Sequence, residues 1–182
     1  MLELCFYSAI DPGNLAVLNQ FRKGLNNPEV LKWPVNGDDP CGPPSWPHVF
    51  CSQTRILQIQ VQGMNLEGVL PGNLNQLSMI MNLSLQKNRF TGALPPLNGL
   101  SGLRWAYFDY NQFDSIPPDF FKGLDSFEVL ALDNNPLNTT TGWSIPIGLQ
   151  NSDWSKNLTS TAKNLTSKNL TSASLNRLPK NG

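Results

Sequence analysis

Four copies of one spacing pattern run through the middle of this 182-residue chain. The clearest copy begins at Ile80 and places apolar residues at positions 1, 4, 6, 11 and 15, asparagine at 9, glycine at 13 and proline at 16. Position 9 of successive copies is Met64, Asn88, Asn111 and Asn135, at separations of 24, 23 and 24 residues. Self-similarity at this period predicts a solenoid with one short strand per repeat. The alternative, a chance spacing of apolar residues, is disfavoured by four copies in register.

Within each copy the pattern assigns a direction to the side chains. Positions 4 and 6 share one side of a strand and are expected to point into the core. The asparagine at position 9 is expected to turn inward, where its amide pairs with backbone groups that would otherwise be buried without partners. Gly92 permits the tight bend that follows. The repeats are predicted to occupy residues 55–150.

This pattern resembles the plant-type leucine-rich repeat. The resemblance implies an α/β fold, a leucine-rich-repeat solenoid with short parallel β-strands on its concave face. It also implies irregular or 3-10 structure on the convex side. Because the first turn of a solenoid exposes an apolar face, a cap is expected to precede it.

Residues 11–54 have the features of such a cap. Asp11 and Pro12 form a helix-start signal, with the carboxylate as N-cap and proline at the first helical position. Leu15, Leu18 and Phe21 then recur at helical spacing. Together with the tryptophans and cysteines that follow, this stretch resembles the N-terminal cap of plant leucine-rich-repeat receptors.

The cap resemblance implies a disulfide between Cys41 and Cys51. Closing this short loop would stabilise the fold by roughly 2–3 kcal/mol. The alternative is a pair of cytosolic thiols, which the accompanying cap and glycosylation motifs disfavour. Residues 1–10 are interpreted as a truncated signal-like segment, because an apolar run there is short, lacks a basic start and contains Glu3. The alternative is an ordinary N-terminus.

Composition excludes several kinds of partner. Only 14% of the residues are charged and the formal net charge is +0, which gives no electrostatic case for binding nucleic acid. No apolar run reaches the roughly 18 residues that would cross a membrane. The only histidine, His48, has no catalytic partners in the sequence, so no enzyme, cofactor or metal site is predicted.

The C-terminal residues 151–182 break the pattern. They repeat Lys-Asn-Leu-Thr-Ser and contain too few apolar residues to offset the entropy of ordering, which predicts a low-complexity, disordered tail. Five sequons make candidate N-glycosylation sites. The inserted loop of the fourth repeat makes Asn138 the best acceptor, whereas Asn82 lies in a predicted strand and the tail sequons follow from the tail's repetition. The candidates are Asn82, Asn138, Asn157, Asn164 and Asn169.

From Asp11 to Leu149 the chain resembles the beginning of the extracellular domain of plant receptor-like kinases of the transmembrane kinase (TMK) family. The segments that carry this resemblance are 11–25, 39–51, 113–124 and 130–146. The family implies a plasma-membrane receptor with a cytosolic Ser/Thr kinase and a link to auxin-dependent growth. No kinase motif is present here, so the chain is predicted to be an ectodomain fragment, extracellular or apoplastic, or at the plasma membrane within a full-length receptor. The alternative is a secreted leucine-rich-repeat inhibitor resembling polygalacturonase inhibitors.

Binding is expected on the concave face, at the strand positions that alternate with the core positions. Exposed aromatic side chains beside amides and carboxylates suit a protein or peptide ligand, or a co-receptor. The alternative is that the aromatic rings only cover one another. The candidate residues are Gln60, Gln62, Gln86, Trp105, Tyr107, Asp109, Tyr110 and Asp133.

Overall fold

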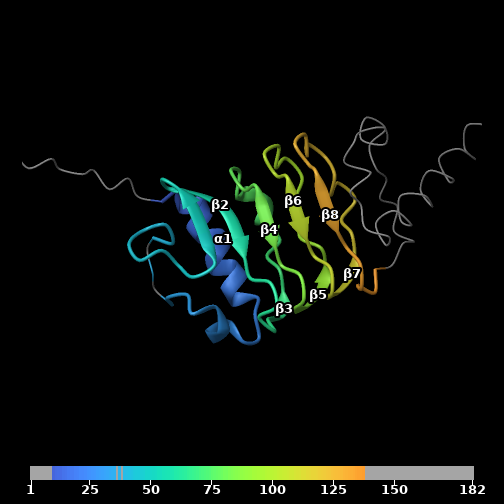
Figure 1. The fold of residues 1–182 in the computed structure, drawn as a ribbon, viewed down its shortest axis with the longest axis horizontal. Helices are drawn as coiled ribbons and strands as arrows, with labels where there is room; N and C mark the ends of the chain where they lie inside the picture. The colour runs from blue at the N-terminus through green and yellow to red at the C-terminus, as the bar shows by residue number, and fades with distance from the viewer. Residues whose placement is uncertain (1–9, 36, 38, 138–182) are drawn as a thin grey trace, which may run out of the picture.

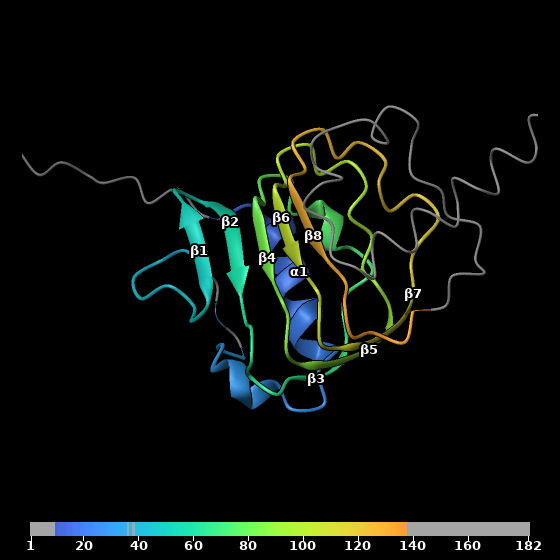
Figure 2. The same cartoon turned by 45° about the vertical axis from the view of Figure 1, so that its right-hand side comes forward.

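A computed structural model describes residues 10–35, 37 and 39–137, which form a solenoid of two β-sheets and an N-terminal helix (Figures 1 and 2). The concave sheet has the strand order β1-β2-β4-β6-β8, and a second sheet has the order β3-β5-β7. Strands β2, β4, β6 and β8 are parallel and supply one strand per repeat, whereas β1 pairs with β2 in the antiparallel sense. The concave strands are β1 (Val49–Ser52), β2 (Arg55–Gln60), β4 (Asn82–Ser84), β6 (Trp105–Tyr107) and β8 (Val129–Ala131). The predicted solenoid and its concave parallel strands are confirmed.

A ladder of asparagine side chains joins consecutive repeats, as the pattern predicts. The Asn88 side-chain oxygen accepts hydrogen bonds from the backbone N–H groups of Met64 (3.1 Å) and Leu66 (3.0 Å), and its amide nitrogen donates to the Val61 carbonyl (2.8 Å). Asn111 and Asn135 repeat this arrangement one and two turns further along the chain. Each asparagine therefore satisfies backbone groups of the repeat before it, which explains why the first repeat tolerates Met64 at this position.

The second sheet differs from the irregular convex side that the sequence predicts. Its strands are β3 (Glu67–Val69), β5 (Arg89–Ala93) and β7 (Gln112–Ser115), paired in parallel. The short 3-10 helix η2 (Leu74–Gln76) supplies convex structure of the predicted kind. The glycine of this segment, Gly92, has a φ of 77°, so the strand and the predicted bend share the same few residues.

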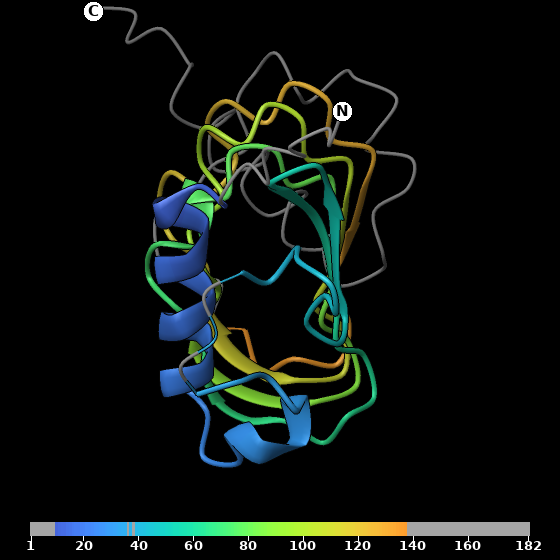
Figure 3. The ribbon, with the colours of Figure 1, turned by 90° about the vertical axis from the view of Figure 1, so that its left-hand side faces the viewer.

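The cap consists of α1 (Pro12–Lys23), the 3-10 helix η1 (Pro28–Leu31) and the β1–β2 hairpin. The Asp11 carboxylate accepts a hydrogen bond from the Gly13 N–H (2.8 Å), which confirms the predicted helix start. Figure 3 shows α1 lying across the core from β1 and β2. On its inner side Phe21 meets Trp33, with ring centroids 5.5 Å apart, and Phe90 of β5 at 6.0 Å, so an aromatic contact joins the cap to the repeats.

Two glycines let the cap approach the first repeat. The Val69 N–H donates to the Gly24 carbonyl (2.9 Å) just after α1, and the Asn26 N–H donates to the Glu67 carbonyl (2.8 Å). A β-carbon at Gly68 would lie 2.1 Å from the Gly24 carbonyl oxygen, and Gly68 has a φ of 131°. Any larger residue at Gly68 would therefore separate the cap from the second sheet.

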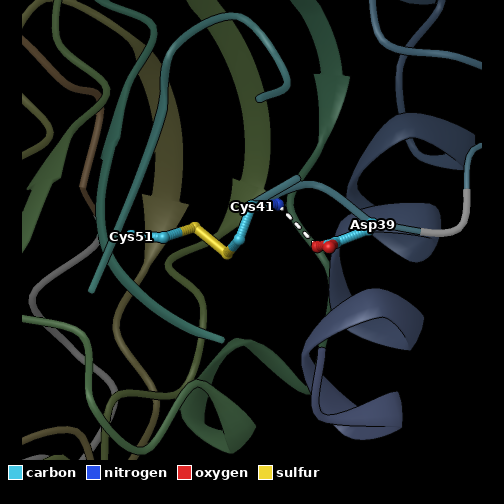
Figure 4. Close-up of a disulfide and its surroundings, with 3 residues drawn as sticks. All are labelled: Asp39, Cys41 and Cys51. Atoms are coloured by element: carbon cyan, nitrogen blue, oxygen red, sulfur yellow. Dashed lines mark hydrogen bonds between the residues drawn. A yellow bond between two sulfur atoms is a disulfide. The ribbon is translucent and has the colours of Figure 1, made fainter. Parts of the chain in front are cut away.

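The Cys41–Cys51 disulfide is confirmed (Figure 4). It ties the loop before β1 to β1 itself, with the two Cα atoms 5.7 Å apart. The Asp39 carboxylate accepts a hydrogen bond from the Cys41 N–H (2.9 Å), which fixes the turn that presents this cysteine. The predictions for the signal-like segment, for Asn138, Asn157, Asn164 and Asn169, and for the tail fall almost wholly on residues outside the described ranges. Among the helices described, none is both long and apolar enough to span a bilayer.

Candidate functional site

The candidate residues form three rows across the concave sheet. Strand register places residues of neighbouring repeats side by side, and backbone hydrogen bonds from Gly63 to Gln86, Lys87 to Asp109 and Tyr110 to Asp133 continue that register beyond the strands. Neighbours in a row are about 4.8 Å apart across the strands. The first row is Gln58, Asn82, Trp105 and Val129, the second is Gln60, Ser84, Tyr107 and Ala131, and the third is Gln62, Gln86, Asp109 and Asp133.

The rows divide the face into two halves of different chemistry. The amide half, on the first two repeats, carries amides and a hydroxyl in its rows and the exposed Lys87 just after them. The aromatic half, on the third and fourth repeats, carries the rings together with two carboxylates. The amide half is Gln58, Gln60, Gln62, Gly63, Asn82, Ser84, Gln86 and Lys87, and the aromatic half is Trp105, Tyr107, Asp109, Tyr110, Val129, Ala131, Asp133 and Asn134.

Side chains of the amide half bind one another along each strand. The Gln60 amide nitrogen donates to the Gln58 side-chain oxygen (2.6 Å), and the Ser84 hydroxyl donates to the Asn82 side-chain oxygen (3.0 Å). The Gln86 side-chain oxygen is buried and has no hydrogen-bond partner within the described part of the chain. These internal bonds leave fewer polar groups of this half available to a partner.

Trp105 is held in place from the edge of the sheet. Its side chain is half-buried, and the Arg104 guanidinium lies over its ring, 4.8 Å from the ring centroid. Arg104 also forms an ion pair with Glu128, which precedes the neighbouring strand. The ion pair helps to position the guanidinium, which covers part of one face of the Trp105 ring.

Tyr107 and Asp109 continue along the same strand direction and are both half-buried. Burial raises the pKa of the Asp109 carboxyl above its ordinary value, and the charge of Asp133 raises it further. A backbone hydrogen bond and the charge of Lys87 act in the opposite direction. Beyond Asp109, Tyr110 is 53% exposed, so the predicted aromatic cluster contains one exposed and two half-buried side chains.

A groove of about 500 Å³ adjoins this half at the edge where the strands begin. It crosses three repeats and includes the Arg104–Glu128 pair beside two methionines, of which Met79 is exposed. The repeat pattern does not predict this groove, because its lining residues precede the strands and do not belong to the alternating strand positions. The recurrence of small residues just before each strand is the signal that could have revealed it. The lining residues are Ser78, Met79, Met81, Ser101, Gly102, Arg104, Ser126 and Glu128.

The described ranges contain no cluster of histidine, cysteine, aspartate or glutamate that could hold a metal ion. His48 is exposed in the cap, and its carbonyl accepts a hydrogen bond from the Gln60 N–H (2.9 Å). Asn82, a predicted glycosylation site, lies within β4 between Gln58 and Trp105, so a glycan there would cover the middle of the concave face. The geometry supports recognition of another molecule on a sheet surface.

The fold and the cap place this chain among leucine-rich-repeat recognition modules of the receptor-ectodomain class. The leucine rich repeat N-terminal domain family matches residues 11–52. Among solved structures, the BIR2 ectodomain of Arabidopsis thaliana aligns with a TM-score of 0.59 and 24% identity, over 71% of this chain and 70% of that chain. PEPR1-AtPEP1 aligns with a TM-score of 0.55 and 24% identity, over 69% of this chain and 18% of the other. These likenesses concern the fold.

The sequence relatives are more specific. Receptor-like kinase TMK2 of Arabidopsis thaliana is 34% identical over 157 residues, which is 84% of this chain and 17% of the relative. Receptor-like kinase TMK4 of the same plant is 33% identical over 107 residues, or 59% of this chain and 11% of the relative. The resemblance to the N-terminal part of a TMK ectodomain is therefore confirmed. The alternative of a secreted enzyme inhibitor is not favoured, and the chain spans about a sixth of the length of TMK2.

Proposed function

We propose that this chain is the ligand- or co-receptor-binding part of a TMK-like cell-surface receptor, and that its partner binds the aromatic half of the concave face. One observation carries the proposal. Trp105 and Tyr107 lie on β6, Asp109 continues the same alternation after the strand, and the exposed Tyr110 follows directly. Such aromatic side chains dominate the energetics of protein interfaces. No described aromatic ring stacks on these three rings, which supports their availability to a partner.

A protein or peptide partner is the occupant that this surface suits. The face is a sheet surface, and its polar groups are side-chain amides, which resemble the backbone amide, and carboxylates. PEPR1-AtPEP1, which has the same fold, is a solved example of such a module with a partner. An extended segment lying across the strands would contact all three rows and bury the rings between polar neighbours.

The cap and the relatives support an extracellular or plasma-membrane setting for this function. The Cys41–Cys51 disulfide is stable in an oxidising compartment, and receptor kinases carry such modules outside the cell or at the plasma membrane. Signalling through a kinase, with the auxin-linked growth that the TMK resemblance implies, belongs to the same proposal for the full-length receptor. Glycosylation at Asn82 would compete with binding on this face, so we expect Asn82 to be unmodified in a binding-competent protein.

Selection from a display library of random 12-residue peptides, with the disulfide-intact 182-residue chain as target, tests the proposal. Peptides that bind the wild type should lose about 2 kcal/mol of binding free energy, roughly 30-fold in Kd, with Trp105→Ala. Phe50→Ala, which removes an exposed ring from the cap end of the same sheet, is the matched control and should leave binding unchanged. If every selected peptide ignores Trp105, Tyr107 and Tyr110 together, the proposal is wrong.

A further inference from the structure

The groove beside the aromatic half has an open floor. Met79, Gly102 and Ser126 each precede the start of a concave strand by three residues, so they form a further row in front of the sheet. The Ser126 N–H donates to the Ser101 carbonyl (3.2 Å), which keeps this row in register. Among the described residues, a β-carbon at Gly102 would approach only the Ile80 carbonyl oxygen, at 4.0 Å. The space above Gly102 is therefore unfilled by the rest of the fold.

Two methionines line this floor with apolar surface. Met79 is 51% exposed, and Met81, directly before β4, is half-buried. Where the second repeat has Met79, the other three have Arg55, Gly102 and Ser126, so the solenoid itself has no need of an apolar side chain at this position. A methionine side chain is flexible and polarizable, and it adapts to apolar groups of irregular shape. The exposed Met79 is therefore suited to contact with a partner.

The charges that line the groove are already paired. The Arg104 guanidinium forms an ion pair with Glu128 and also lies over the Trp105 ring, 4.8 Å from its centroid. A charged occupant would lose its hydration without finding an unpaired counter-charge, whereas an apolar occupant would remove methionine surface from water. Exposed serines border the groove and can bind the backbone of a partner, which gives an apolar centre with a polar rim. These serines are Ser78, Ser101 and Ser126.

The groove is continuous with the aromatic half. Arg104 lines the groove and contacts the Trp105 ring at the same time. Gly102 precedes Trp105 by three residues, which is about 10 Å in an extended chain. The groove also crosses three repeats, again about 10 Å at the spacing of neighbouring strands. An extended peptide that covers Trp105 therefore reaches the groove within about three residues.

We propose that the groove holds an apolar side chain of the partner peptide, of the size of leucine, isoleucine or methionine. This residue lies about three positions from the one that contacts Trp105. The inference rests on the proposed function and adds the chemistry of the partner to it. The side chain packs against Met79 above Gly102, and its burial removes apolar surface of both molecules from water.

The peptides selected on the wild-type chain test this assignment. Those that depend on Trp105 should share an apolar residue, and Gly102→Val, which fills the floor of the groove, should weaken them about 10-fold. The backbone of Gly102 is not left-handed and has room for a side chain, so the variant should fold. Gly72→Val is the matched control, because Gly72 has the same freedom but lies before η2 on the convex side. It should leave binding unchanged.

A second set of variants removes apolar surface instead of filling space. Met79→Ala should weaken the same peptides about 5-fold, whereas Met79→Leu, which keeps volume and polarity, should bind as the wild type does. Val69→Ala, which shortens a side chain of similar exposure on the second sheet, is the control. A peptide with alanine in place of its apolar residue should lose nothing further with Gly102→Val, because both changes remove one interaction.

Three outcomes would overturn the inference. Trp105-dependent peptides that bind Gly102→Val and Met79→Ala as tightly as the wild type contradict the apolar site and leave the proposed function intact. Dimers of the free chain in analytical ultracentrifugation that Met79→Ala dissociates would assign the groove to a second copy of the chain instead. A selection that yields no Trp105-dependent peptide contradicts the proposed function and, with it, this site.

Discussion

The amide half and the aromatic half of the concave face share one backbone and differ in their exposed rows. Both halves have three-residue pairings in parallel register, a buried central row and an asparagine that bonds back to the preceding repeat. In the amide half the polar side chains bind one another, whereas the aromatic half places Trp105, Tyr107 and Tyr110 at the surface. The comparison teaches that the inward positions determine the solenoid, while the outward rows can vary to determine what it recognises.

The largest expected effect concerns the asparagine ladder, which both halves share. Asn88→Ala and Asn111→Ala should each lower the free energy of unfolding by about 3 kcal/mol, because each removes several buried hydrogen bonds and leaves backbone groups without partners. Urea unfolding of the two variants measures this loss. Asn98→Ala, whose side chain accepts one bond from Asn75 on the convex side, should stay within about 0.5 kcal/mol of the wild type.

Equal losses at Asn88 and Asn111 would show that both halves depend on the same ladder. A much smaller loss at Asn111 would contradict the comparison, because the aromatic half would then be held together by something other than its backbone bonding.

An intermediate effect is expected when the aromatic half is given the side chains of the amide half. The double variant Trp105→Gln and Tyr107→Gln copies Gln58 and Gln60, which occupy the same rows on β2. It should fold with an intact disulfide and lose about 2 kcal/mol or more of peptide-binding free energy, because the apolar contact area is gone. Calorimetric titration with a selected peptide measures the loss, and circular dichroism checks the fold.

The control for this exchange is Gln58→Ala, which alters the first row in the amide half and should change binding by less than about 0.5 kcal/mol. If the double glutamine variant binds as the wild type does, the aromatic half has no special role in recognition.

The smallest expected effect is a pH dependence of the free energy of unfolding, caused by Asp109 in the third row of the aromatic half. Burial raises the pKa of Asp109, with a further contribution from Asp133 that Lys87 opposes. Since the folded-state pKa lies above the unfolded one, stability contributed by this carboxyl is complete at low pH and is lost as the pH rises through the folded value. Asp109→Asn should therefore gain stability relative to the wild type between about pH 3 and pH 7.

Because the carboxyl is partly exposed, this gain should remain below about 1 kcal/mol. Urea unfolding at both pH values measures it. Gln86→Ala is the control, because it alters the third row in the amide half and removes no titrating group. Its free energy of unfolding should differ from that of the wild type by the same amount at both pH values. A relative loss of stability for Asp109→Asn as the pH rises would contradict the assigned cause.

Inward-pointing residues made the architecture predictable, and local backbone geometry made other features unpredictable. Asn88 and Asn111 mark the ladder because a buried amide is required at a fixed spacing. The second sheet escaped prediction because β5 contains Gly92, and glycine in this pattern indicates a bend and not a strand. The left-handed backbone of Tyr110, with a φ of 54°, is visible only in three dimensions, since a tyrosine gives no sequence signal for it.

Hydroxyl-radical footprinting of the 182-residue chain, with and without the tightest selected peptide, tests most directly whether recognition occurs on the aromatic half. The peptide should protect Trp105, Tyr107 and Tyr110 from oxidation. Two exposed residues elsewhere, Phe50 at the cap end of the same sheet and Val69 on the second sheet, should oxidise as in the free protein. Protection of Phe50 or Val69 with unchanged oxidation of the three aromatic residues would contradict the central claim.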